Sequence, residues 1–214
     1  MRTRFAEFCA AVVAACVMGA SPANALPLLN LDNLQLKLYV TQVNPDEELH
    51  SVSPAIPGAG VHVSNHTVPT VAIDYFVTPH ISVETICCVT EHDVNGSGAL
   101  AGVRLARHVG IVPATVTALY HFNPGGIDPY VGAGASYFFF YNADAGDLGR
   151  VDLDNSAGWT LQAGVNIPIR NHWAASIDVK KVFLSTTAHF RDAGVRADVR
   201  LDPWVVSAGV AYRF

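Results

Sequence analysis

Charged residues are scarce in this chain: Asp, Glu, Lys and Arg make up 14% of its 214 residues, while 50% are hydrophobic. A soluble globular domain carries about 25% charged residues. Long hydrophobic runs are also missing, since no stretch of about 18 apolar residues follows the first 25 positions. This absence excludes a membrane protein built from spanning helices. An apolar chain without apolar helices leaves two fold classes open, a soluble all-β domain and a membrane β-barrel.

The N-terminus has the pattern of an export signal. Arg2 and Arg4 precede an apolar stretch over residues 8–20, and Ala23-Asn24-Ala25 offers a small-x-small cleavage site. We therefore expect a cleaved signal peptide over residues 1–25 and a mature domain over residues 26–214. The sequence VAAC at residues 13–16 also fits a lipoprotein site that would leave Cys16 lipidated, but the apolar segment continues to a better cut.

Clusters of Lys and Arg are lacking, and the formal net charge is −5, so nucleic-acid binding has no electrostatic basis. Cysteine is scarce as well. Cys9 and Cys16 leave with the signal peptide, so Cys87 and Cys88 form the one possible pair in the mature chain. Because neighbouring residues of a strand point to opposite faces, a bond between them would need an irregular turn. The domain is expected to fold without a disulfide framework.

Alternation of apolar and polar residues with period 2 recurs along the mature chain, and helical periodicity is almost absent. In the segment from residue 67 to 77, for example, Val71, Ile73 and Tyr75 share one face. Asp74 lies on the other face. The pattern predicts eight strands, over residues 34–43, 67–77, 80–89, 111–122, 129–140, 157–167, 173–183 and 203–214.

The connections between these strands alternate in length. Those over residues 78–79, 123–128 and 168–172 are short. The others are long, over residues 44–66, 90–110, 141–156 and 184–201. Short periplasmic turns and long external loops are typical of bacterial outer-membrane barrels. We therefore predict an all-β fold, an eight-stranded antiparallel transmembrane β-barrel.

Aromatic residues on the apolar strand faces fall at two heights of this barrel. Rings of this kind are stable at the boundary between hydrocarbon and water. The group expected at the periplasmic interface is Tyr75, Tyr120, Phe122, Trp173, Tyr212 and Phe214. The group expected at the external interface is Tyr137, Phe139, Trp159, Phe183 and Trp204. Lys181 is the one charge on the lipid side, near the external end of its strand, from where it can reach the interface.

Several motifs carry a resemblance to a known family. The C-terminal strand has LDPW at residues 201–204 and GVAYRF at residues 209–214. The middle strands contain PAT at 113–115, PYVGAG at 129–134 and QAGV at 162–165. In this order the motifs resemble the outer membrane protein W (OmpW) family.

The resemblance implies an eight-stranded outer-membrane barrel with a largely apolar interior that passes small hydrophobic molecules, without enzyme activity or cofactor. Phe214 is similar to the C-terminal aromatic by which the barrel-assembly machinery recognises its substrates. On the residues alone, Phe214 is an interface aromatic, and the two roles are compatible.

An eight-stranded barrel has room for side chains or one small ligand, so the inward residues are the candidate site. The expected lining of the lumen is Lys37, Tyr39, Asp74, Phe76, Glu84, Tyr130, Phe138, Asp178 and Lys180. Buried charges of both signs are expected to pair. Such a network either holds the lumen together or takes part in gating and selectivity.

Two further groups of residues have the types that catalysis or metal binding uses. His80, Ser82 and Glu84 share one strand face, as a hydrolase site would require, but neighbours along one strand cannot form a nucleophile–base relay without a bend. His62 and His66 have a metal-ligand spacing, although two histidines in a polar loop are usually solvated.

The sequence thus favours a barrel in the bacterial outer membrane that contacts its lipid and binds or conducts small hydrophobic solutes. The rival is a non-conducting barrel whose loops meet phage, toxins or host surfaces. A closed charge network from Lys37 to Asp178 would block a continuous pore.

Overall fold

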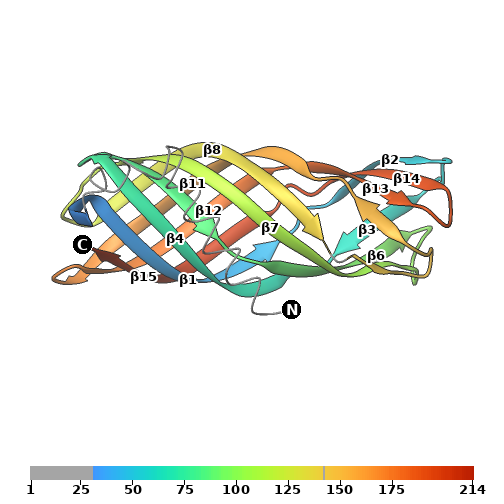
Figure 1. Ribbon diagram of the computed structural model, residues 1–214, viewed down its shortest axis with the longest axis horizontal. Helices are drawn as coiled ribbons and strands as arrows, with labels where there is room; N and C mark the ends of the chain where they lie inside the picture. The colour runs from blue at the N-terminus through green and yellow to red at the C-terminus, as the bar shows by residue number, and fades with distance from the viewer. Residues whose placement is uncertain (1–30, 142) are drawn as a thin grey trace, which may run out of the picture.

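The computed structural model describes residues 31–141 and 143–214. The expected signal peptide and the alternative lipoprotein site lie outside these residues. In the described part of the chain, eight long strands form a closed antiparallel barrel, as the alternation predicts. Figure 1 shows it as an elongated cylinder, with the C-terminus at one end and a crown of shorter strands at the other.

The first half of the barrel follows a short 3-10 helix, η2 (Leu31–Asn33). Its strands are β1 (Leu34–Asn44), β4 (His66–Thr78), β5 (Ile81–Cys87) and β7 (Arg104–His121). The second half consists of β8 (Asp128–Tyr141), β11 (Ser156–Arg170), β12 (Trp173–Phe183) and β15 (Trp204–Arg213). Each strand pairs with its sequence neighbour. The pairing of β1 with β15, from Gln35–Arg213 to Asn44–Trp204, closes the cylinder.

Burial follows the alternation. On β4, Thr70, Ala72, Asp74 and Phe76 are buried, while the residues between them are exposed or half-buried. Most outward apolar residues are exposed or half-buried, because little of the protein covers them. An exposed apolar belt around a closed sheet is the surface that a bilayer solvates.

The four long connections are largely folded, which the expectation of loops did not anticipate. They contain β2 (Glu48–Ser53), β3 (Ala59–Val63), β6 (Thr90–Gly98), β9 (Asp144–Ala145), β10 (Val151–Leu153), β13 (Ser185–Phe190) and β14 (Val195–Arg200). We call these strands and the outer part of β7 the crown. Four of them form a second sheet in the order β10-β13-β14-β2, while β3 pairs with β6, and β6 with β7.

The crown has a hydrophobic core of its own. Its buried members come from β7, β10, β13 and β14, and they are Leu105, Ala106, Val109, Val151, Ala188, Phe190, Ala197 and Val199. This core explains why segments that connect barrel strands extend the walls outward. Among the described residues, no helix has the length and apolar character needed to cross a membrane.

Candidate functional site

A network of buried charges crosses the middle of the barrel. Lys37 Nζ lies 2.8 Å from Asp74 Oδ2 and 2.8 Å from Glu84 Oε2. Lys180 Nζ lies 3.1 Å from Glu84 Oε1 and donates to Asp178 Oδ1 at 2.5 Å. Glu84 therefore links the two ammonium groups. The five side chains come from β1, β4, β5 and β12, so the network connects opposite walls.

Neutral side chains complete this network. Gln162 Nε2 donates to Glu84 Oε1 at 2.9 Å and to Asp178 Oδ2 at 2.6 Å. The Tyr130 hydroxyl donates to Asp178 Oδ2 at 2.8 Å, and Lys37 Nζ lies 4.6 Å from the centre of the Tyr130 ring. All of these side chains are at most 3% exposed. The network thus fills the cross-section of the barrel at this level.

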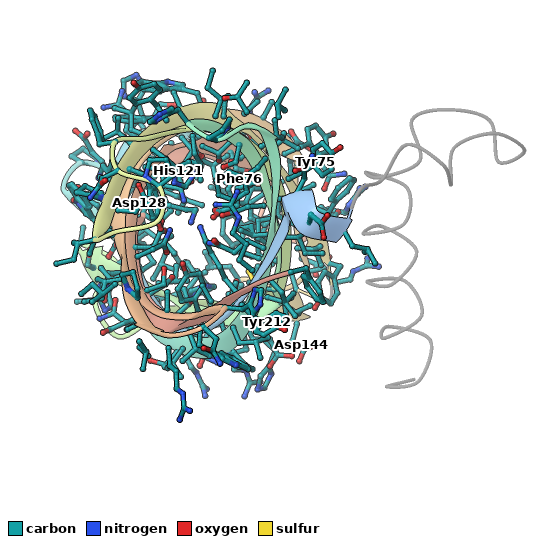
Figure 2. All side chains as sticks on the ribbon, turned by 90° about the vertical axis from the view of Figure 1, so that its left-hand side faces the viewer. Tyr75, Phe76, His121, Asp128, Asp144 and Tyr212 are labelled. Carbon is teal, nitrogen blue, oxygen red and sulfur yellow. The ribbon has the colours of Figure 1, made fainter. Side chains whose placement is uncertain are left out.

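The turn end of the lumen is closed as well. Ser82 Oγ lies 2.9 Å from His121 Nε2, and His121 Nδ1 lies 2.7 Å from Asp128 Oδ2. Phe76 covers His121 with a ring distance of 4.8 Å. Figure 2 looks into this end and shows Phe76, His121 and Asp128 directed inward. The order Ser–His–Asp has the connectivity of a catalytic relay, but Ser82 and His121 have no exposed surface, so in this conformation the hydroxyl meets no solute.

Above the network, the lumen opens into a cavity of about 80 Å³, which we call the inner cavity. Its upper wall is mostly apolar and also contains Thr90 and His92. The apolar members include Val43, Ile86, Ile111, Pro113, Phe138 and Val182. Its floor is formed by hydroxyl side chains, the Tyr39 ring and Lys180. The residues that the sequence predicts to line the lumen thus fall into two groups. Tyr39, Phe138 and Lys180 line the cavity, and Lys37, Asp74, Phe76, Glu84, Tyr130 and Asp178 lie in the closed part below it.

A second cavity of about 80 Å³, the outer cavity, lies within the crown. Its lining is almost entirely apolar and includes Leu105, Phe140 and Phe190. Four residues line both cavities, Val63, His92, Ile111 and Leu201. The two cavities therefore adjoin, and together they form an apolar route from the crown to the middle of the barrel.

His92 is the polar member of this shared wall. Its Nδ1 lies 2.6 Å from the Ser64 carbonyl oxygen, which can only accept, so Nδ1–H is the donor. Burial lowers the pKa of His92, and the Ser64 carbonyl and Asp93 only partly offset this, while His66 adds to it. The neutral ring is therefore the stable form at neutral pH.

The barrel wall is interrupted beside the inner cavity. Pairing of β5 with β7 ends at Ile86–Thr115, and pairing of β6 with β7 begins at Thr90–Ile111. The register is the same on both sides, so three successive pairs are missing from the ladder, at the level of Pro113. Pro113 faces the cavity and has no amide N–H to donate. The regular pairing with β7 is therefore interrupted where the cavity meets the wall.

The aromatic residues group near the two ends of the strands. At the turn end, the ring centres of Tyr120 and Phe122 lie 5.1 Å apart, and those of Trp173 and Tyr212 lie 4.9 Å apart. At the crown end, Tyr137 lies 4.9 Å from Phe139. There the Trp159 and Phe183 rings also stack, at 3.9 Å. Tyr75 and Phe214 belong to the first group, and Trp204 belongs to the second.

Lys181 reaches from the lipid side to the crown end. Its Nζ donates to the Asp202 carbonyl at 2.6 Å and lies 3.1 Å from Asp46 Oδ2 and 4.9 Å from the Trp204 ring. The two histidines with metal-ligand spacing have separate partners: His62 Nδ1 lies 2.7 Å from Glu47 Oε1, and His66 accepts from the Glu91 amide. In the described ranges no group of three or more His, Cys, Asp or Glu residues is arranged to hold a metal ion.

Sequence reasoning missed several members of the site. Gln162, His121, Asp128 and Thr70 share the inward parity of their strands, which could have identified them. The apolar crown residues were assigned to loops because their strands are short, although Val195, Ala197 and Val199 alternate with charged residues. The interruption at Pro113 has a sequence signal in the proline itself.

Comparison with known proteins places these features in context. A family model described as the OmpW family matches residues 31–214. Outer membrane protein W of Salmonella typhi is 31% identical over 165 residues, covering 72% of this chain and 76% of the relative. The "Dibenzothiophene metabolism operon protein PahQ" of Pseudomonas aeruginosa is 26% identical over 163 residues, covering 74% of this chain and 77% of the relative. The crystal structure of the outer membrane protein OprG from Pseudomonas aeruginosa has the same fold, with a TM-score of 0.78 at 22% identity, covering 85% of this chain and 95% of that one.

Proposed function

The chain belongs to the OmpW family of outer-membrane β-barrels, and from this premise we propose that it takes up small hydrophobic solutes through its crown and releases them sideways into the bilayer. One observation carries the proposal: an apolar cavity meets an interruption of the barrel wall directly above a closed lumen. The name of the relative PahQ, which refers to dibenzothiophene metabolism, supports an apolar solute.

The closed lumen argues against passage along the barrel axis. Below the inner cavity, the charge network and the Ser82–His121–Asp128 series are buried and connect opposite walls. A solute that took this path would have to separate ion pairs with little exposed surface, which is costly in a low-dielectric interior. An exit through the wall leaves these pairs intact.

The position of the interruption fits release into lipid. On the other side of β7, Val112 pairs with Phe139 and Ala114 pairs with Tyr137, and both of these aromatics belong to the crown-end group. The interruption therefore lies at the height of the external interface. An open sheet edge inside the hydrocarbon would leave backbone groups without hydrogen bonds, so an opening is more stable near this boundary.

The experiment joins the two sides of the interruption. Val89→Cys and Val112→Cys, in a chain whose Cys87 and Cys88 are replaced by Ser, are bridged with a short bis-maleimide. Uptake of N-phenylnaphthylamine by cells that express the barrel is then followed by fluorescence. The proposal predicts that the bridge removes the uptake that the barrel provides.

The matched control bridges Val83→Cys to Ala118→Cys, an outward pair of β5 and β7 where the ladder is intact. This bridge should leave uptake unchanged. Uptake that persists with Val89 and Val112 joined would contradict lateral release. No uptake by the unbridged barrel would favour the rival function, a surface-interaction protein that binds a partner through its crown.

Export and assembly complete the proposal. We propose that residues 1–25 are the signal peptide and that Phe214 is recognised by the barrel-assembly machinery. Phe214 is 47% exposed, and its amide donates to the Leu34 carbonyl at 3.1 Å, so deleting it removes little packing. A loss of assembled barrel in cells but not in refolding with purified lipid would support recognition, and equal yields in cells would contradict it. Uptake and release, as proposed, neither form nor break a covalent bond of the solute.

A further inference from the structure

The inner cavity changes from apolar to polar at one level on several strands. From the crown inward, Val43 is followed by Thr41 on β1, Val182 by Lys180 on β12, and Val205 by Ser207 on β15. The same change occurs from Pro113 to Thr115 on β7. Each change takes place within two residues, about 7 Å of strand. On these four strands the cavity therefore changes from an apolar upper part to a polar floor, while Thr90 and His92 are polar members of the upper part.

Most hydroxyls of this floor are paired with one another. Thr41 Oγ1 lies 2.9 Å from Ser207 Oγ, and Thr160 Oγ1 lies 2.7 Å from Ser136 Oγ. Tyr39 Oη lies 2.7 Å from Ser176 Oγ. These pairs satisfy the buried hydroxyls without any ligand.

Thr70 is different. It lines the cavity and is 5% exposed, yet among the described residues its Oγ1 has no hydrogen-bond partner. A buried hydroxyl without a partner is costly, because it loses its bonds to water and gains none. The oxygen itself has almost no accessible surface, so a rotation about the Thr70 Cα–Cβ bond toward the cavity is needed before a ligand hydroxyl can bond to it.

The charges at the floor restrict the kind of head group. Lys180 is the charged residue in the cavity lining, so a cationic head would meet its ammonium group. An anionic head would approach the carboxyl groups of Asp74, Glu84 and Asp178, which already engage both Lys37 and Lys180. Lys180 is also engaged by Glu84 and Asp178. Either ion would lose its hydration without a free counter-charge.

We propose that the inner cavity binds neutral amphiphiles that carry a hydroxyl head, such as medium-chain alcohols, with the head on Thr70 and the hydrocarbon chain directed toward the crown. This inference rests on the proposed function and names the substrate class of the same site. The hydrocarbon chain of the ligand passes the residues shared by the two cavities, so its end enters the apolar outer cavity.

The test is a head-group series measured by isothermal titration calorimetry on the barrel in lipid nanodiscs, with empty nanodiscs subtracted for partitioning. The ligands are 1-octanol, 1-fluorooctane, which has a similar size but donates no hydrogen bond, and octanoate. One hydrogen bond corresponds to a preference for 1-octanol over 1-fluorooctane of about 3- to 10-fold. Octanoate should bind more weakly than 1-octanol.

Two variants assign the preference to one atom. Thr70→Val removes the hydroxyl with little change of shape, so the preference should fall below about twofold while 1-fluorooctane binds as before. Thr117→Val is the matched control, because Thr117 Oγ1 is also buried without a partner in the described ranges but does not line the cavity. Thr117→Val should retain the wild-type preference.

The outcomes separate the two proposals. Equal binding of the three ligands, tightest binding of octanoate, or an equal loss in both variants would overturn the head-group inference and leave hydrophobic uptake standing. No saturable binding of any ligand would overturn both.

Discussion

Replacing Lys37 with Met tests the closed lumen. The Lys37 side chain has no exposed surface, and its ammonium lies 2.8 Å from two carboxylates, Asp74 and Glu84. After the substitution, Glu84 keeps Lys180 at 3.1 Å and Gln162 at 2.9 Å. Asp74 keeps a 3.3 Å bond from Gln35 Nε2 and its contact with the Glu84 carboxyl group, but it loses Lys37, its ion-pair partner. Two neighbouring buried carboxyl groups are then left with Lys180 as the ammonium group of the network.

Removing one member of a buried ion pair costs about 3–5 kcal/mol, so Lys37→Met should lower the free energy of unfolding by this amount. The assay is equilibrium urea unfolding in lipid vesicles, followed by tryptophan fluorescence. Lys37→Met/Asp74→Asn should recover part of the loss, because the uncompensated charge is gone. The control is Lys181→Met, which breaks a pair with Asp46, itself 69% exposed, and should cost about 1 kcal/mol or less. Equal losses for Lys37→Met and Lys181→Met would refute this account of the network.

Three further predictions concern the crown and the closure of the barrel. Because burial lowers the pKa of His92, the stability of the wild type should be constant above about pH 6.5 and fall as the pH drops below it. His92→Leu should remove this pH dependence. Unfolding at pH 7.5 and 5.5 measures both proteins, and an unchanged dependence of stability on pH in the variant would contradict the prediction. Phe190→Ala should destabilise the crown by about 3–5 kcal/mol. Amide hydrogen exchange should become faster in β13 and β14 but not in β1 and β15. Equally faster exchange in all four strands would show that the crown has no separate stability. A Cβ atom at Gly209 would lie 1.9 Å from the Leu38 carbonyl oxygen. Gly209→Val should therefore prevent closure of β1 on β15 and abolish heat-modifiable gel migration. A variant that still migrates as a folded barrel would contradict this prediction.

The fold was predictable because the barrel strands obey a strict period of 2. The predicted segment over residues 173–183 coincides with β12, and the fold and family predictions are confirmed. Strand bounds were less accurate at the crown, where β7 begins at Arg104 rather than at residue 111. There the strands continue beyond the membrane belt into a core that only tertiary contacts between β7, β10, β13 and β14 create.

The candidate site was partly visible in the sequence. Parity places Lys37, Asp74 and Glu84 on inward faces, and charges of both signs there are expected to pair. Parity gives no distances, so which groups pair and whether the lumen is closed could not be derived. The Ser82–His121–Asp128 series joins β5, β7 and β8, and only the register between these strands brings it together. The role of the inward residues in solute binding stays a prediction.

Ionic current through the barrel in a planar bilayer tests the central claim most directly. The barrel is refolded, its insertion is verified by heat-modifiable migration, and Phe76→Ala/Tyr130→Ala serves as a variant with space opened in the closed part of the lumen. The account predicts no discrete conductance steps for the wild-type barrel, because the network from Lys37 to Asp178 fills its cross-section. Reproducible steps in the wild type, altered by Asp74→Asn or Glu84→Gln, would show that the lumen conducts and would contradict lateral release as the route.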